Sequence, residues 1–348
     1  MVTTARAAGA IVSNPCEWDD AVRDRGGHLL QSWRWGEFKQ RHGWDVERFA
    51  VVTQRSANLA QVLYKTRGPV SLAYIPRGPV FDPRDSDGLR DLFAQIDAAG
   101  KKRRALYLMV ESNSALPFTG NFKSEGFVRG SDHFQPSRTV KIPLLPDAEL
   151  LAQMHQKTRY SVRLAERRGV ELVRMEPAAS AVDDFYALLQ DTSSRNEFGI
   201  HSRAYYQDFL DIFGDDALLL FAKVDGVSAA GLIAAKFNEE AIYMYGASST
   251  EHRAHGGAFA LQFEAMRWAR DNGALRYDLW GIPKQDPVST SEDDMKRVAG
   301  TRGSDWRGLF KFKTGFGGDI VTYPPTLERR YNRLLAFTAK RFNDRTGA

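Results

Sequence analysis

Two lysines stand directly before a glycine-rich turn near the end of the chain. They alternate with phenylalanines in Phe310-Lys-Phe-Lys313, and glycines follow at positions 315, 317 and 318. A lysine ammonium can stabilise a developing oxyanion, and glycines let a ligand approach the backbone closely. In a strand, Lys311 and Lys313 would share one face. The segment is therefore a candidate cationic site, although these residues alone are explained better by an edge strand with solvated lysines.

A second cationic segment begins near residue 157. Arg159, Arg163 and Arg167 are spaced four residues apart, with Lys157 close to the start of the series. On a helix, this spacing forms one basic ridge. Such a ridge can follow the phosphate backbone of a nucleic acid. A solubilising face explains the pattern equally well, because Glu166 stands among the basic residues.

A glycine-containing turn, Arg253-Ala-His-Gly256-Gly-Ala258, stands directly before a predicted helix. It fits the Arg-x-x-Gly-x-Ala loop with which acetyltransferases bind the pyrophosphate of coenzyme A, because N–H groups at a helix start bind phosphate. Simple capping explains the turn equally well. The chain has no Walker loop, dinucleotide-binding glycine fingerprint, Gly-x-Ser-x-Gly elbow or His-Glu-x-x-His motif. Its seven histidines are scattered, so no metal site is expected.

The elements that must position these residues form an internal repeat. Two hairpin-joined strands, a third strand, a helix and a fourth strand are predicted at 48–52, 59–64, 71–75, 87–99 and 105–110, and again at 218–224, 229–235, 241–245, 258–271 and 275–279. Asp225-Gly226 predicts a type I′ hairpin turn in the second copy. Because the order resembles that of the N-acetyltransferase-like (GNAT-like) fold, we predict an α/β (α+β) protein with two tandem GNAT-like domains, each a mixed sheet packed with helices.

The composition is that of a folded, soluble protein. The chain has 348 residues, of which 43% are hydrophobic and 26% charged, so collagen-like and disordered classes are excluded. Its net charge of +5 is a mild excess that favours phosphate-bearing partners. A single cysteine, Cys16, excludes an intramolecular disulfide and favours the reducing cytosol. No apolar run approaches the roughly 18 residues of a membrane span.

A linker between the two copies is expected at residues 143–146, where Pro143 and Pro146 stand. We predict a first domain at 1–145 and a second at 146–320. The tail from Leu327 to Phe342 has apolar residues at helical spacing with arginines between them. A C-terminal helix within 321–348 is therefore expected to pack back on the first domain, and contact with an anionic membrane surface is the alternative.

Motifs spread over nearly the whole chain resemble those of the Fem family. They are Gln31-Ser-Trp-Arg-Trp-Gly-Glu-Phe-Lys39 with Gly43-Trp44, Tyr74-Ile-Pro-Arg-Gly-Pro-Val80 with Asp82, Gln135-Pro136, Lys157-Thr-Arg159, Tyr243-Met-Tyr-Gly-Ala247, Tyr277-Asp-Leu-Trp-Gly-Ile282 and Gly308-Leu-Phe-Lys-Phe-Lys-Thr-Gly-Phe-Gly-Gly318. Members of this family are aminoacyl-tRNA-dependent aminoacyltransferases with two acetyltransferase-like domains. Some carry a long helical arm, but the absence of a sustained heptad stretch makes this chain resemble the shorter type.

The resemblance implies a catalytic lysine. In the family pattern, the lysine of the Phe-Lys pair before the glycine-rich turn stabilises the tetrahedral oxyanion, which carries over to Lys313 with Phe312 beside it. Lys311 is the competing assignment, because it follows Phe310 at the same spacing. An aminoacyl ester is already activated, so transfer to an amine needs alignment and an oxyanion donor rather than an enzyme nucleophile.

The resemblance also implies an acceptor site. Lys39 would bind the diphosphate of the precursor, with Arg203 as its partner and Arg195 as the alternative partner. Tyr206 and Tyr245 would contact the sugar-peptide part of the precursor, and Glu111 would meet the acceptor amine. An amine must be deprotonated before it attacks, so a carboxylate such as Glu111 could act as a base or only orient the amine.

The function implied is transfer of an amino acid from aminoacyl-tRNA to the stem-peptide amine of a peptidoglycan precursor, which forms the interpeptide bridge. The expected partners are aminoacyl-tRNA, bound by the ridge of Lys157, Arg159, Arg163 and Arg167, and a UDP-linked or lipid-linked muropeptide. No cofactor is expected beyond the aminoacyl-tRNA co-substrate, and the expected location is the cytoplasm, including the inner face of the membrane. An acyl-CoA-dependent N-acyltransferase and a non-enzymatic RNA-binding protein are the alternatives.

Overall fold

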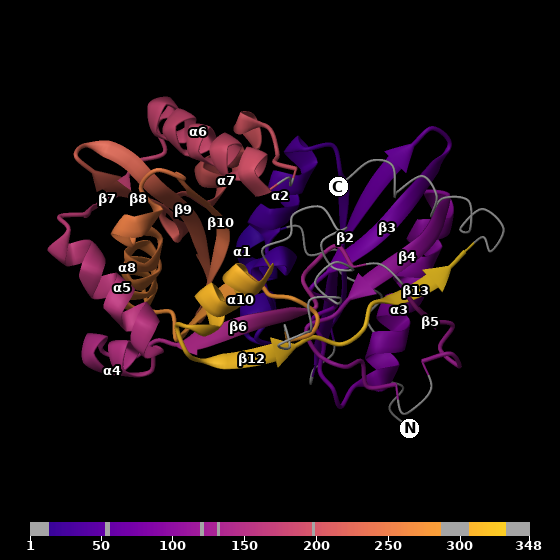
Figure 1. The fold of residues 1–348 in the computed structure, drawn as a ribbon. Helices are drawn as coiled ribbons and strands as arrows, with labels where there is room; N and C mark the ends of the chain where they lie inside the picture. Colours follow the sequence, from indigo (N-terminus) through magenta and orange to yellow (C-terminus); the bar gives the residue numbers. More distant parts are fainter. Residues whose placement is uncertain are drawn as a thin grey trace, which may run out of the picture. The chain divides into compact units, whose positions relative to one another are not determined.

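The computed structural model describes residues 14–52, 56–118, 122–130, 133–196, 199–286 and 306–331. The chain divides into two compact units, one formed by residues 1–135 and 323–348 and the other by residues 136–322. Each unit is built on one mixed β-sheet (Figure 1).

The first unit contains a six-stranded sheet of order β1-β2-β3-β4-β13-β5, in which β3 and β4 are parallel. Its helices are α1 (Pro15–Arg23), η1 (Leu29–Gln31), α2 (Trp33–Arg41) and α3 (Ser86–Lys102). Its strands are β1 (Asp45–Val52), β2 (Ala57–Arg67), β3 (Val70–Pro76), β4 (Ala105–Glu111), β5 (Val128–Arg129) and β13 (Leu327–Arg330). Helix α3 buries Leu89, Leu92, Phe93 and Ile96 against the sheet, because this spacing places them on one helical face.

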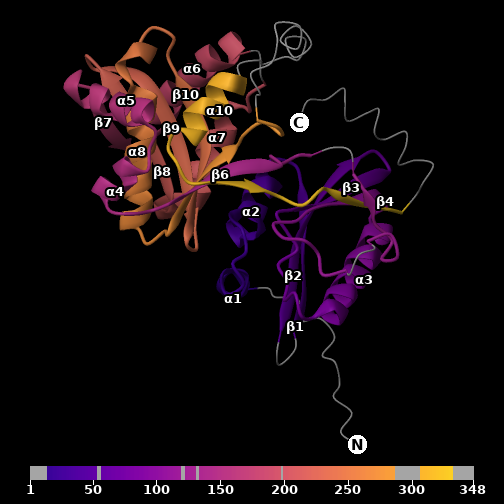
Figure 2. The same cartoon turned by 60° about the horizontal axis from the view of Figure 1, so that its bottom comes forward.

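The second unit contains a seven-stranded sheet of order β12-β6-β11-β10-β9-β8-β7. Its strands are β6 (Arg138–Pro143), β7 (Glu171–Met175), β8 (Ala217–Val224), β9 (Val227–Phe237), β10 (Glu240–Ser248), β11 (Arg276–Gly281) and β12 (Asp319–Thr322). Its helices are α4 (Asp147–Ala152), α5 (Gln156–Arg167), α6 (Ala179–Asn196), α7 (Arg203–Phe213), η2 (Gly214–Asp216), η3 (Arg253–His255), α8 (Gly257–Asp271) and α10 (Trp306–Thr314). Helices α5 and α8 lie on one face of this sheet and α6 and α7 on the other, as the turned view also shows (Figure 2).

The structure confirms the predicted repeat. The series β1, β2, β3, α3, β4 in the first unit recurs as β8, β9, β10, α8, β11 in the second, with the same strand neighbours. The turn at Asp225 and Gly226 has φ of 50° and 80°, as a type I′ hairpin requires, and Val224 pairs with Val227 across it. The fold is therefore two tandem GNAT-like units.

The boundary between the units differs from the prediction of 1–145 and 146–320. The chain enters the second unit after Gln135 and returns after Thr322. The reason is backbone pairing: β6, which the prediction assigned to the first domain, is hydrogen-bonded between β11 and β12 in the second sheet. The first strand of the second sheet therefore comes ahead of the predicted linker in the sequence and ends at Pro143, where that linker starts.

The C-terminal segment also differs from the predicted helix within 321–348. Residues 319–322 form β12, and Leu327–Arg330 form β13, which pairs antiparallel with β4 in the first sheet. Without β13, the N–H and C=O groups along that side of β4 would lack ladder partners. The free energy gained by pairing them is larger than the gain from the helical spacing of the side chains. The predicted helix beyond residue 331 lies outside the described residues.

Helix α5 packs on the glycine turn that precedes α8. Gly256 has φ of 79°, and a Cβ placed there would lie 2.6 Å from the carbonyl oxygen of Ser161 on α5. Both Gly256 and Gly257 are buried. The turn therefore allows two helices to approach closely.

This contact predicts the effect of Gly256→Ala on stability. The left-handed backbone alone costs about 1–2 kcal/mol for alanine, and the clash with Ser161 adds to that cost because the neighbouring atom belongs to the backbone. Gly226→Ala is the matched control, since Gly226 has φ of 80° with nothing within 4 Å of the added Cβ. Urea unfolding should show a clearly larger loss of free energy for Gly256→Ala than for Gly226→Ala, and equal losses would contradict the contact.

Candidate active site

The central strands of the second sheet diverge. Strands β10 and β11 pair in parallel only from Glu240 opposite Arg276 to Ile242 opposite Asp278, although both strands continue. A bulge interrupts β10 between Tyr243 and Tyr245, and another interrupts β11 after Asp278. In the first unit, by contrast, the equivalent strands β3 and β4 stay paired to Pro76 and Glu111. A side chain can therefore enter between the strands in the second unit only where the pairing has stopped.

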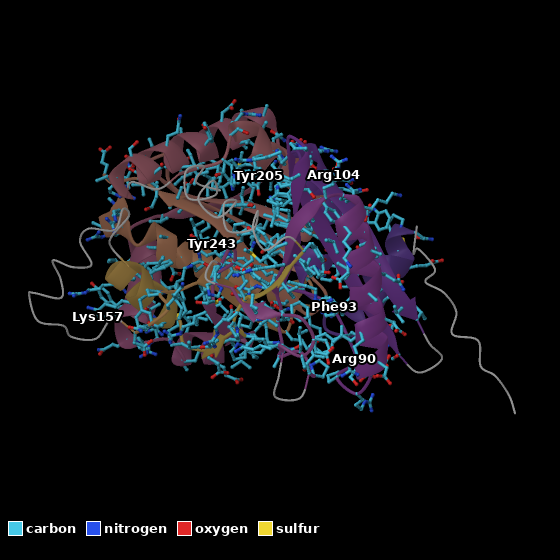
Figure 3. The ribbon with its side chains drawn as sticks, turned by 90° about the vertical axis from the view of Figure 1, so that its right-hand side faces the viewer. Arg90, Phe93, Arg104, Lys157, Tyr205 and Tyr243 are labelled. Carbon is cyan, nitrogen blue, oxygen red and sulfur yellow. The ribbon has the colours of Figure 1, made fainter. Side chains whose placement is uncertain are left out.

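Lys313 lies at this divergence. Its ammonium donates a hydrogen bond of 2.8 Å to the carbonyl oxygen of Gly281 on β11 and lies 5.5 Å from the ring centre of Tyr243 on β10. The side chain is buried, with 6% of its surface exposed. Figure 3 shows Tyr243 among the side chains of the second unit. The ammonium thus lies beside atoms of both diverging strands.

The segment that carries Lys313 is helical, which corrects the expectation of a strand. Residues Trp306–Thr314 form α10, and Phe312 packs edge-to-face with Phe259 and Phe316 at ring distances of 4.9 and 5.3 Å. Phe312 on this helix and Phe316 in the turn that follows it both pack in the apolar core of the second unit. Lys311 is exposed instead. The helical periodicity therefore separates the two lysines, and Lys313 is the one that lies at the divergence of the strands.

Burial changes the acid–base behaviour of Lys313. Removal of the ammonium from water lowers its pKa to about 8, and the attraction of Asp278 acts in the opposite direction. The lysine is therefore mostly charged at neutral pH and loses its proton at mildly alkaline pH. A charged donor in a buried position interacts strongly with a developing anion.

Lys39 occupies an aromatic site in the first unit. Its Nζ lies 5.6 to 5.8 Å from the ring centres of Trp35, Phe38 and Trp44. Burial, with a smaller effect of the positive charge of Lys65, lowers the pKa of Lys39 to about 8. Lys65 itself lies 5.4 Å from the ring centre of Trp44. Two cations that share one aromatic ring repel each other, so an anion bound between them would be stabilised.

Glu111 accepts hydrogen bonds from the protein itself. Its carboxylate is 4% exposed and accepts from the hydroxyl of Tyr74 and from the N–H groups of Phe134 and Gln135, at 2.7 and 3.0 Å for the latter two. Burial raises its pKa, and these hydrogen bonds act against that rise. Because the carboxylate is engaged with its own chain, the geometry favours a role in holding residues 134–135 over one as a freely accessible base.

The remaining acceptor-site candidates lie in the second unit. Tyr206 is 2% exposed, accepts a hydrogen bond from the N–H of His201 at 3.2 Å and packs edge-to-face on Tyr245 at 5.1 Å. Tyr205, labelled in Figure 3, belongs to the same aromatic cluster. Arg203 makes an ion pair of 2.5 Å with Asp183 on α6. These three predicted site residues thus have protein partners, and Tyr206 and Tyr245 are brought together by the fold.

The basic ridge is largely exposed, as predicted. Lys157, Arg163 and Arg167 are exposed on α5, and Lys157 extends from the ribbon in Figure 3. Arg159 behaves differently: its guanidinium donates to the carbonyl oxygens of Leu151 and Ala152, at the C-terminal end of α4, and to that of Met154. Three of the four residues are therefore available for an anionic partner, whereas Arg159 fixes α4 to α5.

The sequence analysis did not assign roles to Asp278, Gly281 or Tyr243. These residues stood in quoted motifs, but nothing in their spacing indicated that they would surround Lys313. One signal was available: Asp278 is an acidic residue inside the apolar strand segment Tyr277-Asp-Leu279, where burial normally requires a partner.

Together, the two tandem sheets and the diverging strands define a protein of the tandem acetyltransferase-like class. The model of the FemAB family matches residues 17–117, 121–229 and 225–343, so the chain belongs to the FemAB family.

Known relatives agree with this assignment. The chain is 24% identical over 370 residues to a lipid II:glycine glycyltransferase of Staphylococcus haemolyticus and 25% identical over 374 residues to that of Staphylococcus aureus, with 82% of this chain and 88% of each relative covered. Among solved structures, FemX has a TM-score of 0.81 at 23% identity and covers 93% of this chain and 98% of its own. A tandem GNAT protein from the clavulanic acid biosynthesis pathway has a TM-score of 0.54 at 13% identity, with 93% and 97% covered.

The described helices differ from a membrane span in length or in hydropathy. Within residues 14–331, apart from the segments outside the described ranges, no helix is both long and apolar enough to span a bilayer. The longest described helix, α6, has 18 residues, so this part of the chain also contains no extended helical arm.

The buried position of Lys313 predicts its chemical reactivity. Only the neutral amine reacts with acetic anhydride, so labelling of Lys313 should rise with pH around a midpoint of about 8. Lys311, two residues away and exposed, provides a comparison within the same peptide when labelling is read by mass spectrometry. A midpoint for Lys313 at the ordinary value of a lysine, about 10.4, would contradict the buried environment.

Proposed function

We propose that this FemAB-family aminoacyltransferase transfers an amino acid from aminoacyl-tRNA to the stem-peptide amine of a peptidoglycan precursor, with Lys313 as the oxyanion donor. The observation that carries the proposal is the buried ammonium of Lys313 between β10 and β11. The family match and the glycyltransferase activity named for the relatives supply the reaction class and the acceptor class.

The chemistry needs little beyond alignment and charge. The lone pair of the acceptor amine forms a C–N bond to the ester carbonyl, and the carbonyl oxygen takes the negative charge. When the tetrahedral intermediate collapses, the bond to the ribose oxygen of the tRNA breaks, the amine loses one proton, and the ribose oxygen gains one. Lys313 stabilises the oxyanion because its charge is already desolvated and oriented by Gly281.

The acceptor carries a diphosphate whether it is linked to UDP or to a lipid. Lys39, with Lys65 beside the same tryptophan, would bind this group as a pair of point charges. The names of the relatives favour the lipid-linked precursor, which would bring the enzyme to the inner face of the membrane. Arg203, Tyr206 and Tyr245 remain candidates for contacts with the rest of the precursor.

Aminoacyl-tRNA would be held by the exposed residues of α5, namely Lys157, Arg163 and Arg167. Contacts to phosphate from such a ridge make binding depend strongly on salt. Arg159 would support this surface indirectly, because it fixes α5 to the end of α4.

An acyl-CoA donor is the alternative, because the glycine turn before α8 resembles a pyrophosphate-binding loop. Its close packing against Ser161 on α5 is also explained by helix packing alone. The direct test uses purified protein with labelled aminoacyl-tRNA and with both UDP-linked and lipid-linked precursors. Transfer to either precursor supports the proposal, whereas acetyl-CoA consumption without transfer, or tRNA binding without turnover, would overturn it.

Replacing Lys313 should affect the chemical step. Lys313→Met keeps the apolar stem and removes the charge, so kcat should fall by about 10² to 10³ with little change in either KM. Lys311→Met is the matched control, because Lys311 is exposed on the same helix. Equal losses in the two variants, or a change of Lys313→Met confined to KM, would contradict the assignment.

Replacing Lys39 should affect acceptor binding. Lys39→Ala should weaken binding of the precursor by about 1.5–3 kcal/mol, the range for a hydrogen bond to a charged group, and should raise its KM accordingly. The KM for aminoacyl-tRNA should barely change. Arg41→Ala, two residues further along α2 and exposed, controls for a general effect of surface charge. If the acceptor KM of Lys39→Ala equals that of the wild type, Lys39 does not bind the diphosphate.

A further inference from the structure

A fully buried carboxylate lies next to the hydrogen-bond acceptor of Lys313. Asp278 on β11 has 0% of its surface exposed. It accepts hydrogen bonds from the hydroxyl of Thr139 on β6 and, at 2.7 Å, from the N–H of Trp280. The proposed transfer chemistry uses none of these groups. Burial of a carboxylate costs free energy unless hydrogen-bond donors replace the lost water. The donors around Asp278 therefore indicate what this residue does in the fold.

The hydrogen bond to Trp280 shapes the turn that follows the strand. Trp280 has φ of 61°, a left-handed conformation that residues other than glycine adopt at a cost in free energy. An aspartate that accepts a hydrogen bond from the N–H two residues further on stabilises such a turn. The side chain of Asp278 therefore offsets the strain at Trp280 and ends the regular pairing of β11.

The other end of the turn is also fixed. Gly281 returns to pair with Thr139 on β6, and a Cβ at Gly281 would lie 2.7 Å from Cγ of Pro136. Thr139 thus contacts the turn twice, through its backbone opposite Gly281 and through its hydroxyl on Asp278. These constraints leave the carbonyl oxygen of Gly281 in one orientation, in which it accepts the hydrogen bond from Lys313.

We propose that Asp278 is a positioning residue for Lys313: it holds the turn through Trp280 and Gly281 whose carbonyl oxygen accepts the hydrogen bond from the lysine. This inference rests on the proposed role of Lys313 in aminoacyl transfer. Asp278 touches neither substrate in this scheme. It acts through the backbone of the turn at Gly281, which orients the ammonium of Lys313.

The charge of Asp278 acts on Lys313 as well. Its attraction raises the pKa of the lysine, against the larger effect of burial. Within the second unit, titratable groups near this point include Glu240 on β10, paired at 2.5 Å with Lys141 on β6, and the hydroxyls of Tyr243 and Tyr277. Lys141 lies 3.8 Å from Asp278 and already has Glu240 as its nearer partner. Removal of the charge of Asp278 should therefore lower the pKa of Lys313.

Two substitutions separate geometry from charge. Asp278→Asn keeps an oxygen that can accept from Thr139 and Trp280 but removes the charge, whereas Asp278→Ala removes both. For Asp278→Ala we expect kcat to fall by about 10- to 100-fold, because the ammonium of Lys313 is no longer held in one orientation. Each KM should stay within about threefold of the wild type. Asp278→Asn should lose less activity, and Thr139→Val should lie between Asp278→Asn and the wild type.

Labelling with acetic anhydride supplies a readout independent of activity. In Asp278→Asn the midpoint of Lys313 labelling should move to lower pH, and a midpoint lower by about one pH unit would speed labelling below the midpoint by about tenfold. Asp271→Asn, which removes an exposed carboxylate at the end of α8, should leave both kcat and the midpoint unchanged. The folded state of each variant is checked by its thermal unfolding.

Three outcomes would overturn the inference. One is a folded Asp278→Ala variant with wild-type kcat. Another is equal loss of kcat in Asp278→Asn and Asp278→Ala with the labelling midpoint unmoved, since this indicates a role in folding alone. If Asp278→Ala does not fold, wild-type kcat and midpoint in both Asp278→Asn and Thr139→Val also overturn it. If the wild type itself transfers no amino acid, the proposed function fails, and the labelling midpoint still decides whether Asp278 controls Lys313.

Discussion

The burial of one lysine ammonium constrains the whole second unit. A buried ammonium is unfavourable unless acceptors replace the water it loses. Here the acceptor is the carbonyl oxygen of Gly281, which is available because β10 and β11 stop pairing after Ile242 and Asp278. The bulge in β10, the left-handed residue Trp280 and the aromatic packing of α10 all serve this single arrangement.

The internal repeat shows how one fold can carry two roles. In the first unit, β3 and β4 stay paired as far as Glu111, the last residue of β4, whose carboxylate accepts a hydrogen bond from the N–H of Phe134. In the second unit the equivalent pair opens and admits Lys313. The first unit instead presents Lys39 on α2, surrounded by three aromatic rings. The two copies of the repeat thus differ. In the second unit the central strands separate around a buried cation, and in the first unit they stay paired while a cation lies on the neighbouring helix α2.

Two lysines with lowered pKa values suit two different tasks. Burial is the chief cause in both, and it lowers each pKa to about 8. At neutral pH both remain mostly charged, so each can meet an anion in a poorly hydrated place, where the interaction is strong. For Lys39 this anion would be present throughout binding, whereas for Lys313 it would appear only during the reaction. In the proposed mechanism, burial of a lysine would therefore support affinity in the first unit and rate in the second.

The sequence by itself determined the repeat and the type I′ turn at Asp225-Gly226, because strand periodicity and turn residues are local signals. The FemAB relationship came from the resemblance of motifs along the chain. The sequence also identified Lys39 and Lys313 as residues of interest through family motifs. It could not place β6 and β13, because backbone pairing with a distant strand leaves no local trace in six or four residues. It assigned α10 to a strand, because alternating lysine and phenylalanine fits both periods until the core that covers Phe312 and Phe316 is known. The proposed role of Asp278 depends on tertiary structure: Trp280 is two residues away in the sequence, but Thr139 comes from a strand 139 residues away, and nothing in a linear sequence brings it to the turn.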